Sequence, residues 1–462
     1  MLVPAFVSWG YGEQDTAFVF LISAFVTAVV GFLLARVRLT GSDTIHRRDA
    51  FLFVTGAWIL AGAFSALPLL LDGAVTTYTD AYFEAVSGLT TTGSTILTDI
   101  EASSKGCLMW RSLMHWLGGM GIVVLFVAIF PQLGVGGKFL FQSEGSGNTI
   151  TAGLKPRIKE TSAILWRIYV GFTAVNAIAL YLCGMNGFDA VNHAMSTMAT
   201  GGYSTQNASV GAYDNVGVDA VTTVFMILAG INFSLYFMVS RGRWRRAFSN
   251  RELWTYLAVA VMATLFVTIS IINKHGGIFT AFRYAAFQTA SILTGTGFGT
   301  DDFAAYPPAS QLLFVLLMFL GGCAGSTTGG LKIYRLIVMI KACNRELIRA
   351  FRPQSVQAVR VGRSVVPEET VRAIFVCFGL FIMVFIVMSI VVAAMGIDIV
   401  TATASVAATL CNIGPGLARV GPTETYAFLP AAAKWLLSGC MIIGRLEVIT
   451  VAALLSPTFW RR

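Results

Sequence analysis

Long apolar stretches alternate with short polar segments along most of this chain. A membrane-spanning helix needs about 20 apolar residues to cross the hydrocarbon core, and nine stretches reach roughly that length. They lie at 16–35, 51–71, 108–130, 164–184, 218–240, 253–272, 310–331, 371–395 and 433–455. Residues 1–9 are also apolar but shorter, and we expect them to be the end of a helix whose start is missing. The pattern predicts an all-α protein that crosses a membrane many times.

The composition supports a membrane protein and argues against other classes. Hydrophobic residues make up 56% of the chain and charged residues 12%, about half the usual charged share of a soluble domain. The apolar stretches are too long and uniform for the alternating strands of a membrane barrel. The seven Cys and four His lack the spacing of metal ligands, so no transition metal is expected. Spans almost free of ionisable residues argue against the alternative of a membrane enzyme.

The basic residues predict an orientation. Most of the 32 Lys and Arg lie in one alternate set of connections, which the positive-inside rule assigns to the cytoplasm together with the C-terminus. We therefore attribute the net charge of +9 to topology and contact with anionic lipid, and not to nucleic-acid binding. Most acids fall on the opposite, outer side, where they favour cations. Glu84 and Arg111 are both assigned to that outer side.

The outer connections contain an internal repeat. Four semi-apolar segments end in Thr and Gly or in a similar turn, and they recur about every 100 residues, which indicates a repeated structural unit. They are 80–93, 189–202, 280–297 and 398–414. Each is too short to cross the membrane, and we expect a capping residue (Asp80, Asp189, Thr280 and Asp398, respectively) to open a half-helix that dips in and returns.

Four returning segments predict one central ion pathway. Irregular backbone at membrane depth must be buried in protein or line water, and the alternative of four tight outer loops does not account for the repeat. The half-helices would direct their partly negative C-terminal ends inward, with carbonyls that can replace the hydration shell of a cation. The predicted units are an N-terminal region (1–48) and four helix, re-entrant loop, helix repeats at 49–150, 151–247, 248–362 and 363–462.

Several motifs resemble one known superfamily. They are SGLTTTGST (87–95), HWLGGMGIVVL (115–125), MATGGYST (198–205), LGGCAGSTTGGLK (320–332), ATLCNIGPGL (408–417), and GRLE (444–447) with SPTFWR (456–461). From about Arg48 to Arg462 the chain resembles the bacterial K⁺ transporters of the superfamily that contains TrkH and KtrB, and TrkH in particular.

The resemblance implies gated, channel-like K⁺ uptake driven by the membrane potential, in a bacterial inner membrane. K⁺ would be the substrate, with no organic cofactor on this chain. The implied partners are a second copy in a homodimer and a cytoplasmic TrkA-type regulatory ring that binds the nucleotide. A Na⁺ or poorly selective cation pathway, and H⁺- or Na⁺-coupled K⁺ symport, remain as alternatives.

The resemblance also implies a K⁺ selectivity filter, with three residues from each repeat. These are Thr91, Thr92 and Gly93; Thr200, Gly201 and Gly202; Gly295, Thr296 and Gly297; and Asn412, Ile413 and Gly414. Related Na⁺-carrying plant proteins have serine in place of the first glycine, so Gly93 favours K⁺.

A glycine-rich interruption of the span near 310–341 predicts unwound chain that lines a cavity beneath the filter, because such a sequence does not form a stable helix and such backbone cannot face lipid. The resemblance implies that this segment is the intramembrane loop that gates the pathway; close helix packing through glycine is the alternative. The candidate gate residues are Gly321, Gly322, Gly325, Ser326, Thr327, Thr328, Gly329, Gly330, Lys332 and Arg445.

Two cations belong to this predicted gate. Lys332 either contacts the loop or extends to the inner interface. Arg445 lies inside a predicted span, where an unpaired Arg is costly, and Glu447 faces a different side of the helix. We therefore expect Arg445 to bind carbonyls of the glycine-rich loop; a purely structural Arg is the alternative.

Overall fold

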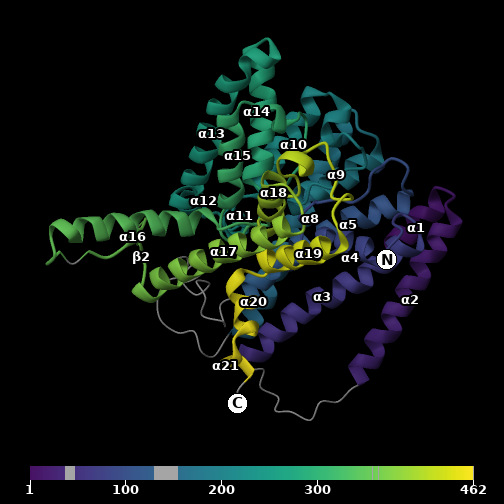
Figure 1. Ribbon diagram of the computed structural model, residues 1–462, viewed down its shortest axis with the longest axis horizontal. Helices are drawn as coiled ribbons and strands as arrows, with labels where there is room; N and C mark the ends of the chain where they lie inside the picture. The colour runs from purple at the N-terminus through teal and green to yellow at the C-terminus, as the bar shows by residue number, and fades with distance from the viewer. Residues whose placement is uncertain (37–46, 129–153, 356, 363, 461–462) are drawn as a thin grey trace.

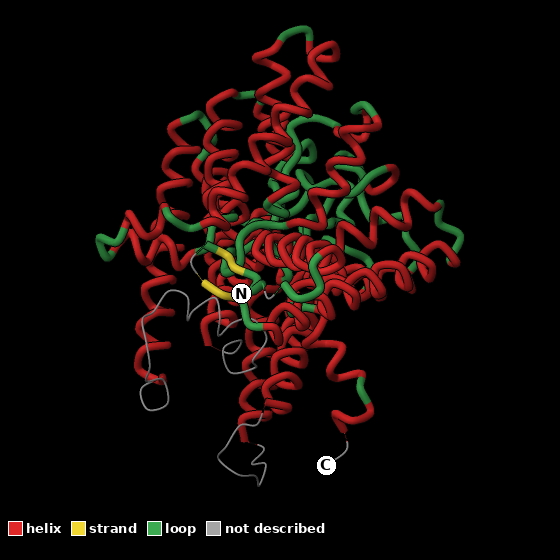
Figure 2. Tube along the Cα trace, turned by 90° about the vertical axis from the view of Figure 1, so that its left-hand side faces the viewer, coloured by secondary structure: helices red, strands yellow, loops and turns green. Residues whose placement is uncertain are grey.

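The computed structural model describes residues 1–36, 47–128, 154–355, 357–362 and 364–460. These residues are mostly helical, and the strands among them form one short antiparallel hairpin, β1 (Arg360–Val361) with β2 (Ser364–Val365). Two of the expected boundaries between repeats, 150/151 and 362/363, include residues outside the described ranges. Arg461 and Arg462 also lie outside these ranges. Loops gather inside the body of the molecule, surrounded by helices (Figure 2).

Two helices precede the repeats at one edge of the molecule (Figure 1). Residues 1–9 contribute to α1 (Leu2–Gly10), a short helix of its own, and α2 (Gln14–Arg36) packs against it. Many apolar side chains of α2 are exposed, including Phe18, Phe25 and Phe32. This exposure is expected of a helix that faces lipid.

Four units of similar order follow. The first contains α3 (Arg47–Leu71), α4 (Tyr78–Leu89) and α5 (Lys105–Ala128); the second contains α8 (Leu154–Leu182), α9 (Gly187–Ala199), α10 (Val216–Ala229) and α11 (Phe233–Ser240). The third contains α13 (Arg251–His275), α14 (Ile278–Leu293), α15 (Pro308–Leu320) and α16 (Ile333–Phe351); the fourth contains α17 (Glu368–Ala394), α18 (Ile399–Leu410), α19 (Ala431–Arg445) and α20 (Val448–Leu455). The short helices are α12 (Trp244–Phe248), α21 (Pro457–Trp460), η1 (Ser209–Tyr213), η2 (Phe303–Ala305) and η3 (Ala418–Val420).

The four units pack in a closed ring. Within each unit the half-helix packs on the preceding long helix, in the pairs α3–α4, α8–α9, α13–α14 and α17–α18. Between units, the helix after each half-helix packs on the half-helix of the next unit, in the pairs α5–α9, α10–α14, α15–α18 and α19–α4. The last pair returns to the first unit, so the four half-helices surround one axis. This is the predicted fold of four helix, re-entrant loop, helix repeats.

Two predicted spans are bent. Within the described residues, five helices are long and apolar enough to cross a membrane, and two bent pairs raise the number to seven. The expected continuous spans 218–240 and 433–455 are wrong, because α10 and α11 meet at 90° and α19 and α20 at 116°. Asn232 opens α11 by accepting a hydrogen bond from Ser234 N, and Glu447 has a φ of 64° between α19 and α20. The span predicted at 108–130 extends beyond the described part of α5.

The half-helices begin slightly differently from the prediction. Asp398 caps α18 by accepting from Thr401 N, as expected. The caps of α4 and α9 are Thr77 and Asn186 rather than Asp80 and Asp189, and Gly277 precedes α14. In α4 and α9 the cap accepts from the backbone of the Asp three positions later. This spacing is that of a capping box, in which the acid at the third helical position also supports the helix start.

Candidate ion pathway

Each half-helix ends in a loop with the same backbone pattern. The first position of each loop has positive φ: 53° at Thr91, 54° at Thr200, 67° at Gly295 and 54° at Asn412. The last position does too: 82° at Gly93, 84° at Gly202, 81° at Gly297 and 95° at Gly414. Positive φ is unfavourable for residues with a side chain, so Thr91, Thr200 and Asn412 are strained and the surrounding structure must maintain their conformation.

The last glycine of each loop packs on the next loop. A side-chain carbon at these glycines would overlap a backbone carbonyl oxygen of the neighbouring repeat. The pairs are Gly93 with Gly201 O, Gly202 with Thr296 O, Gly297 with Ile413 O, and Gly414 with Thr92 O. The fourth pair closes the circle, so the structure brings all twelve predicted filter residues into one ring of backbone.

Side chains fix the ring from behind. Thr90 and Thr92 share a hydrogen bond of 2.7 Å, and the corresponding Thr294 and Thr296 share one of 2.6 Å. In the fourth repeat, Asn412 Nδ2 donates to Thr92 Oγ1 over 2.9 Å, and it also donates to Met441 O over 2.9 Å. These bonds engage side chains of the first, third and fourth loops, and backbone carbonyls are among the groups that the loops can offer to a cation.

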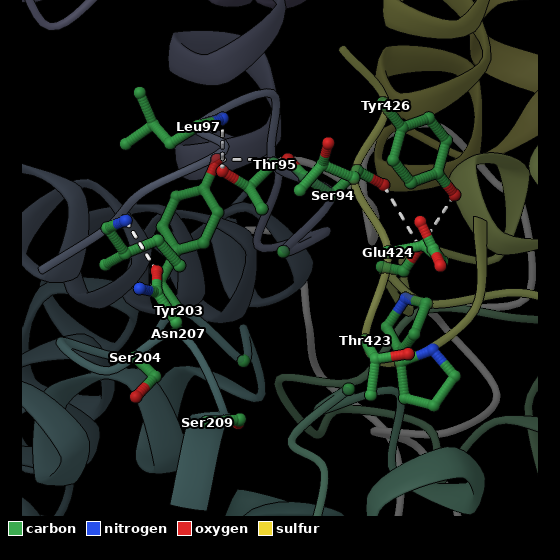
Figure 3. A pocket seen from close by; sticks show the side chains of 18 of the residues that line it. Ser94, Thr95, Leu97, Tyr203, Ser204, Asn207, Ser209, Thr423, Glu424 and Tyr426 are labelled. Atoms are coloured by element: carbon green, nitrogen blue, oxygen red, sulfur yellow. Dashed lines mark hydrogen bonds between the residues drawn. The ribbon is translucent and has the colours of Figure 1, made fainter. Parts of the chain in front are cut away.

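A cavity of about 130 Å³ opens next to the ring, and all four final glycines line it. Tyr203 and Tyr426 lie on opposite sides of it (Figure 3). The Tyr426 hydroxyl donates to Gly414 O over 2.8 Å, and Ser94 Oγ donates to the same oxygen over 3.2 Å. The cavity thus lies directly against the last residue of every loop in the ring.

Asn207, which also lines the cavity, donates a side-chain hydrogen bond to Asp99. This bond lowers the pKa of the Asp99 carboxyl from its ordinary value.

The glycine-rich segment is a buried loop on the other side of the ring. Helix α15 ends at Leu320, and the chain returns so that Leu331 N donates to Phe319 O over 3.0 Å. The Thr200 hydroxyl donates to Thr327 Oγ1 over 3.3 Å, and Gly329 packs against the carbonyl of Cys411. An added carbon at Gly329 would also lie 3.1 Å from Cβ of Asn412, so the loop lies directly against predicted filter residues of the second and fourth repeats.

Two buried cations bind this loop. Arg445 Nη1 donates to Thr327 O over 2.7 Å, as expected from the sequence, and Nη2 donates to Gly118 O over 3.2 Å. Lys332 is 5% exposed and donates to the carbonyl and hydroxyl of Thr328, so it does not extend to the interface. Arg445 lies at the end of α19, where the chain bends, and not in a continuous helix as predicted.

A family model described as "TrkH: Cation transport protein" matches residues 16–461. The chain belongs to the TrkH family. The Trk system potassium uptake protein TrkH of Halomonas elongata is 39% identical over 451 residues, which is 96% of this chain and 92% of the relative. TrkH of Escherichia coli K12 is 37% identical over 466 residues, or 100% and 96% of the two chains. The crystal structure of the potassium transporter TrkH from Vibrio parahaemolyticus aligns with a TM-score of 0.91 at 37% identity, covering 100% and 96%.

In this TrkH family chain, Glu84 and Arg111, which the sequence assigns to the outer side, lie on helices α4 and α5 and not in an exposed outer loop. Both side chains are buried next to the filter and form an ion pair of 2.9 Å. Glu84 lies inside a segment that the sequence predicts to enter the membrane. A carboxylate at such a position needs a nearby partner, and this was the signal available in the sequence.

A second acid, Glu252, lies at the glycine-rich loop, and the sequence did not predict this contact. Its Oε1 accepts from Ala324 N over 2.7 Å and from Tyr334 N over 3.2 Å. The carboxylate thus joins the middle of the loop to the start of α16. The sequence offers little signal for this contact, because Glu252 looks like an ordinary acid in the first turn of a helix.

Proposed function

We propose that this protein is the translocation subunit of a K⁺ uptake system. The observation that carries the proposal is the ring of four loops, in which each final glycine packs on a carbonyl of the next loop. A ring of backbone carbonyls can replace the hydration shell of a cation. The relatives named as Trk system potassium uptake proteins support K⁺ as the substrate and transport, rather than catalysis, as the activity.

K⁺ selectivity is assigned to the twelve ring residues. Gly93 supports K⁺ over Na⁺, since a side chain there would displace the carbonyl of Gly201. In this proposal the ion is substrate, and no organic cofactor is bound by this chain.

The gate is assigned to loop residues 321–330 together with Lys332 and Arg445. Both cations bind carbonyls of the loop, and their charge adds an electrostatic barrier beneath the filter. A displacement of the loop would have to break these bonds, which supports a control point at this place.

The membrane potential supplies the driving force in this proposal, about 2.3 kcal/mol per charge for each 100 mV. The flow is passive. The alternatives are a poorly selective or Na⁺ pathway and coupled symport with H⁺ or Na⁺, and the flux experiment below distinguishes them.

The cellular setting and partners complete the proposal. We place the chain in a bacterial inner membrane with its C-terminus in the cytoplasm, as a homodimer with a filter in each subunit. In this proposal the four repeats are residues 49–150, 151–247, 248–362 and 363–462, as the sequence predicts. A TrkA-type ring that binds nucleotide would dock on the basic segment 332–363, which includes the projecting helix α16 (Figure 1).

The test is ⁸⁶Rb⁺ influx into vesicles that contain the purified protein and have a negative-inside potential. We expect saturable influx that K⁺ inhibits and Na⁺ does not, measured first without and then with a matching regulatory ring. Equal inhibition by Na⁺, or no influx even with the ring, would contradict K⁺-selective transport. Influx that needs a H⁺ or Na⁺ gradient would favour coupled symport.

A further inference from the structure

A charged pair lies behind the outer edge of the filter. Glu84 on α4 is fully buried, and Arg111 on α5 is 1% exposed. Arg111 Nε donates to Glu84 Oε1 over 2.9 Å. The Glu84 carboxylate also accepts from Ile96 N over 2.9 Å and from the hydroxyl of Thr95, two positions after Gly93. This carboxylate therefore holds the chain that leaves the first filter loop.

The same pair reaches the second repeat. Arg111 Nη1 donates to Ser204 O over 3.2 Å, two positions after Gly202, and the guanidinium lies 4.0 Å from the centre of the Tyr203 ring. The Tyr203 hydroxyl returns to the first repeat by donating to Glu84 O over 2.9 Å. The Arg111 guanidinium thus fixes the first and second filter loops relative to each other.

The four repeats differ in how the half-helix holds the chain that follows the filter loop. The position nine residues before the final filter glycine is Glu84, His193, Gln288 or Ser405. His193 Nε2 bonds Ser204 Oγ over 2.9 Å and Gln288 Nε2 donates to Asp301 O over 2.7 Å, so both also hold the chain after the filter. Within the described residues, the Ser405 hydroxyl bonds inside its own helix, to Ala402 O. Among these four positions, only the first carries an ion pair.

We propose that the Glu84–Arg111 pair is a positioning element that sets the K⁺ preference of the filter by fixing the first and second loops against each other. This inference rests on the proposed K⁺ function. Gly93 contacts the carbonyl of Gly201 in the second loop, so a shift between these two loops changes the spacing of the carbonyls. A preference based on carbonyl coordination depends on that spacing.

The experiment compares two variants in the ⁸⁶Rb⁺ assay with competing K⁺ and Na⁺. Arg111→Lys keeps the charge, but one ammonium cannot reproduce the forked geometry that serves Glu84, Thr95 and Ser204 together. Glu84→Gln removes the charge that Arg111 faces. We expect either variant to lower the K⁺ preference over Na⁺ by about tenfold, the scale of one lost charged hydrogen bond. The double variant with Gln at both positions, which buries no unpaired charge, replaces either single variant that fails to fold.

The matched controls are Arg283→Lys and Asp219→Asn. Arg283 forms an ion pair of 2.7 Å with Asp219 between α14 and α10, and neither residue lines the cavity. We expect these controls to retain the wild-type preference.

Three outcomes decide the proposal. Lower unfolding temperatures with an unchanged K⁺ preference would make the pair merely structural and overturn the inference while leaving K⁺ transport intact. An equal loss of preference in the controls would also overturn it. A wild-type protein without K⁺ preference would overturn both this inference and the proposed function.

Discussion

Arg445 donates a hydrogen bond of 2.7 Å to the carbonyl oxygen of Thr327, and this bond joins the end of α19 to the loop beneath the filter. Arg445 is 3% exposed, so the bond forms away from bulk solvent. Arg445 is therefore one of the buried charged residues that hold the loop in place, together with Lys332 and Glu252.

Replacement of this charge should release the loop. We expect Arg445→Ala to raise ⁸⁶Rb⁺ influx in the resting state by about tenfold or more, since a hydrogen bond to a charged group contributes about 1.5–3 kcal/mol. Arg335→Ala is the control, because Arg335 pairs with Glu447 and not with the loop. Resting influx equal to that of the wild type would contradict the assignment of Arg445 to the gate.

A side chain at Gly93 should disturb the ring. Gly93 has a φ of 82°, and an added carbon overlaps the carbonyl oxygen of Gly201. We expect Gly93→Ser to bring inhibition by Na⁺ close to that by K⁺. Gly379→Ser is the control because nothing lies within 4 Å of the added carbon. If Gly93→Ser retains the full K⁺ preference, Gly93 does not belong to the K⁺ site.

Loss of the Glu252 carboxylate should loosen the loop. In Glu252→Ala, the backbone N–H groups of Ala324 and Tyr334 lose their shared acceptor, at a cost of about 1–3 kcal/mol for each buried donor. We expect a higher resting influx and a lower unfolding temperature, with Glu252→Gln intermediate because it keeps a neutral acceptor. Glu346→Ala removes a half-exposed acid on α16 and should change neither quantity. If Glu252→Ala has the resting influx and the unfolding temperature of the wild type, Glu252 does not hold the loop.

Two substitutions at Asn412 separate backbone strain from hydrogen bonding. Both Asn412→Ala and Asn412→Gly lose the bonds to Thr92 and Met441. The φ of 54° penalises alanine by about 1–2 kcal/mol but not glycine. We therefore expect Asn412→Ala to unfold at a lower temperature than Asn412→Gly in detergent. Equal temperatures would mean that the positive φ stores no strain.

The sequence was informative where a pattern is local. Apolar length located the helices, and the repeated segments located the four half-helices with all their filter glycines. It failed at 218–240 and 433–455, because an apolar stretch looks the same whether it is straight or bent. In these stretches the bends follow from caps and close contacts, such as Asn232 at α11 and Gly230 against Tyr256.

The sequence by itself determined that this chain is a membrane protein with four copies of one unit, because the length of apolar stretches and the spacing of glycines are properties of the chain alone. Only the tertiary structure decided which residues meet across the repeats. Gly93 contacts Gly201, Arg111 reaches Ser204, and Arg445 reaches Thr327. These partners are about 100 residues apart or more, and closure of the ring around one axis brings them into contact.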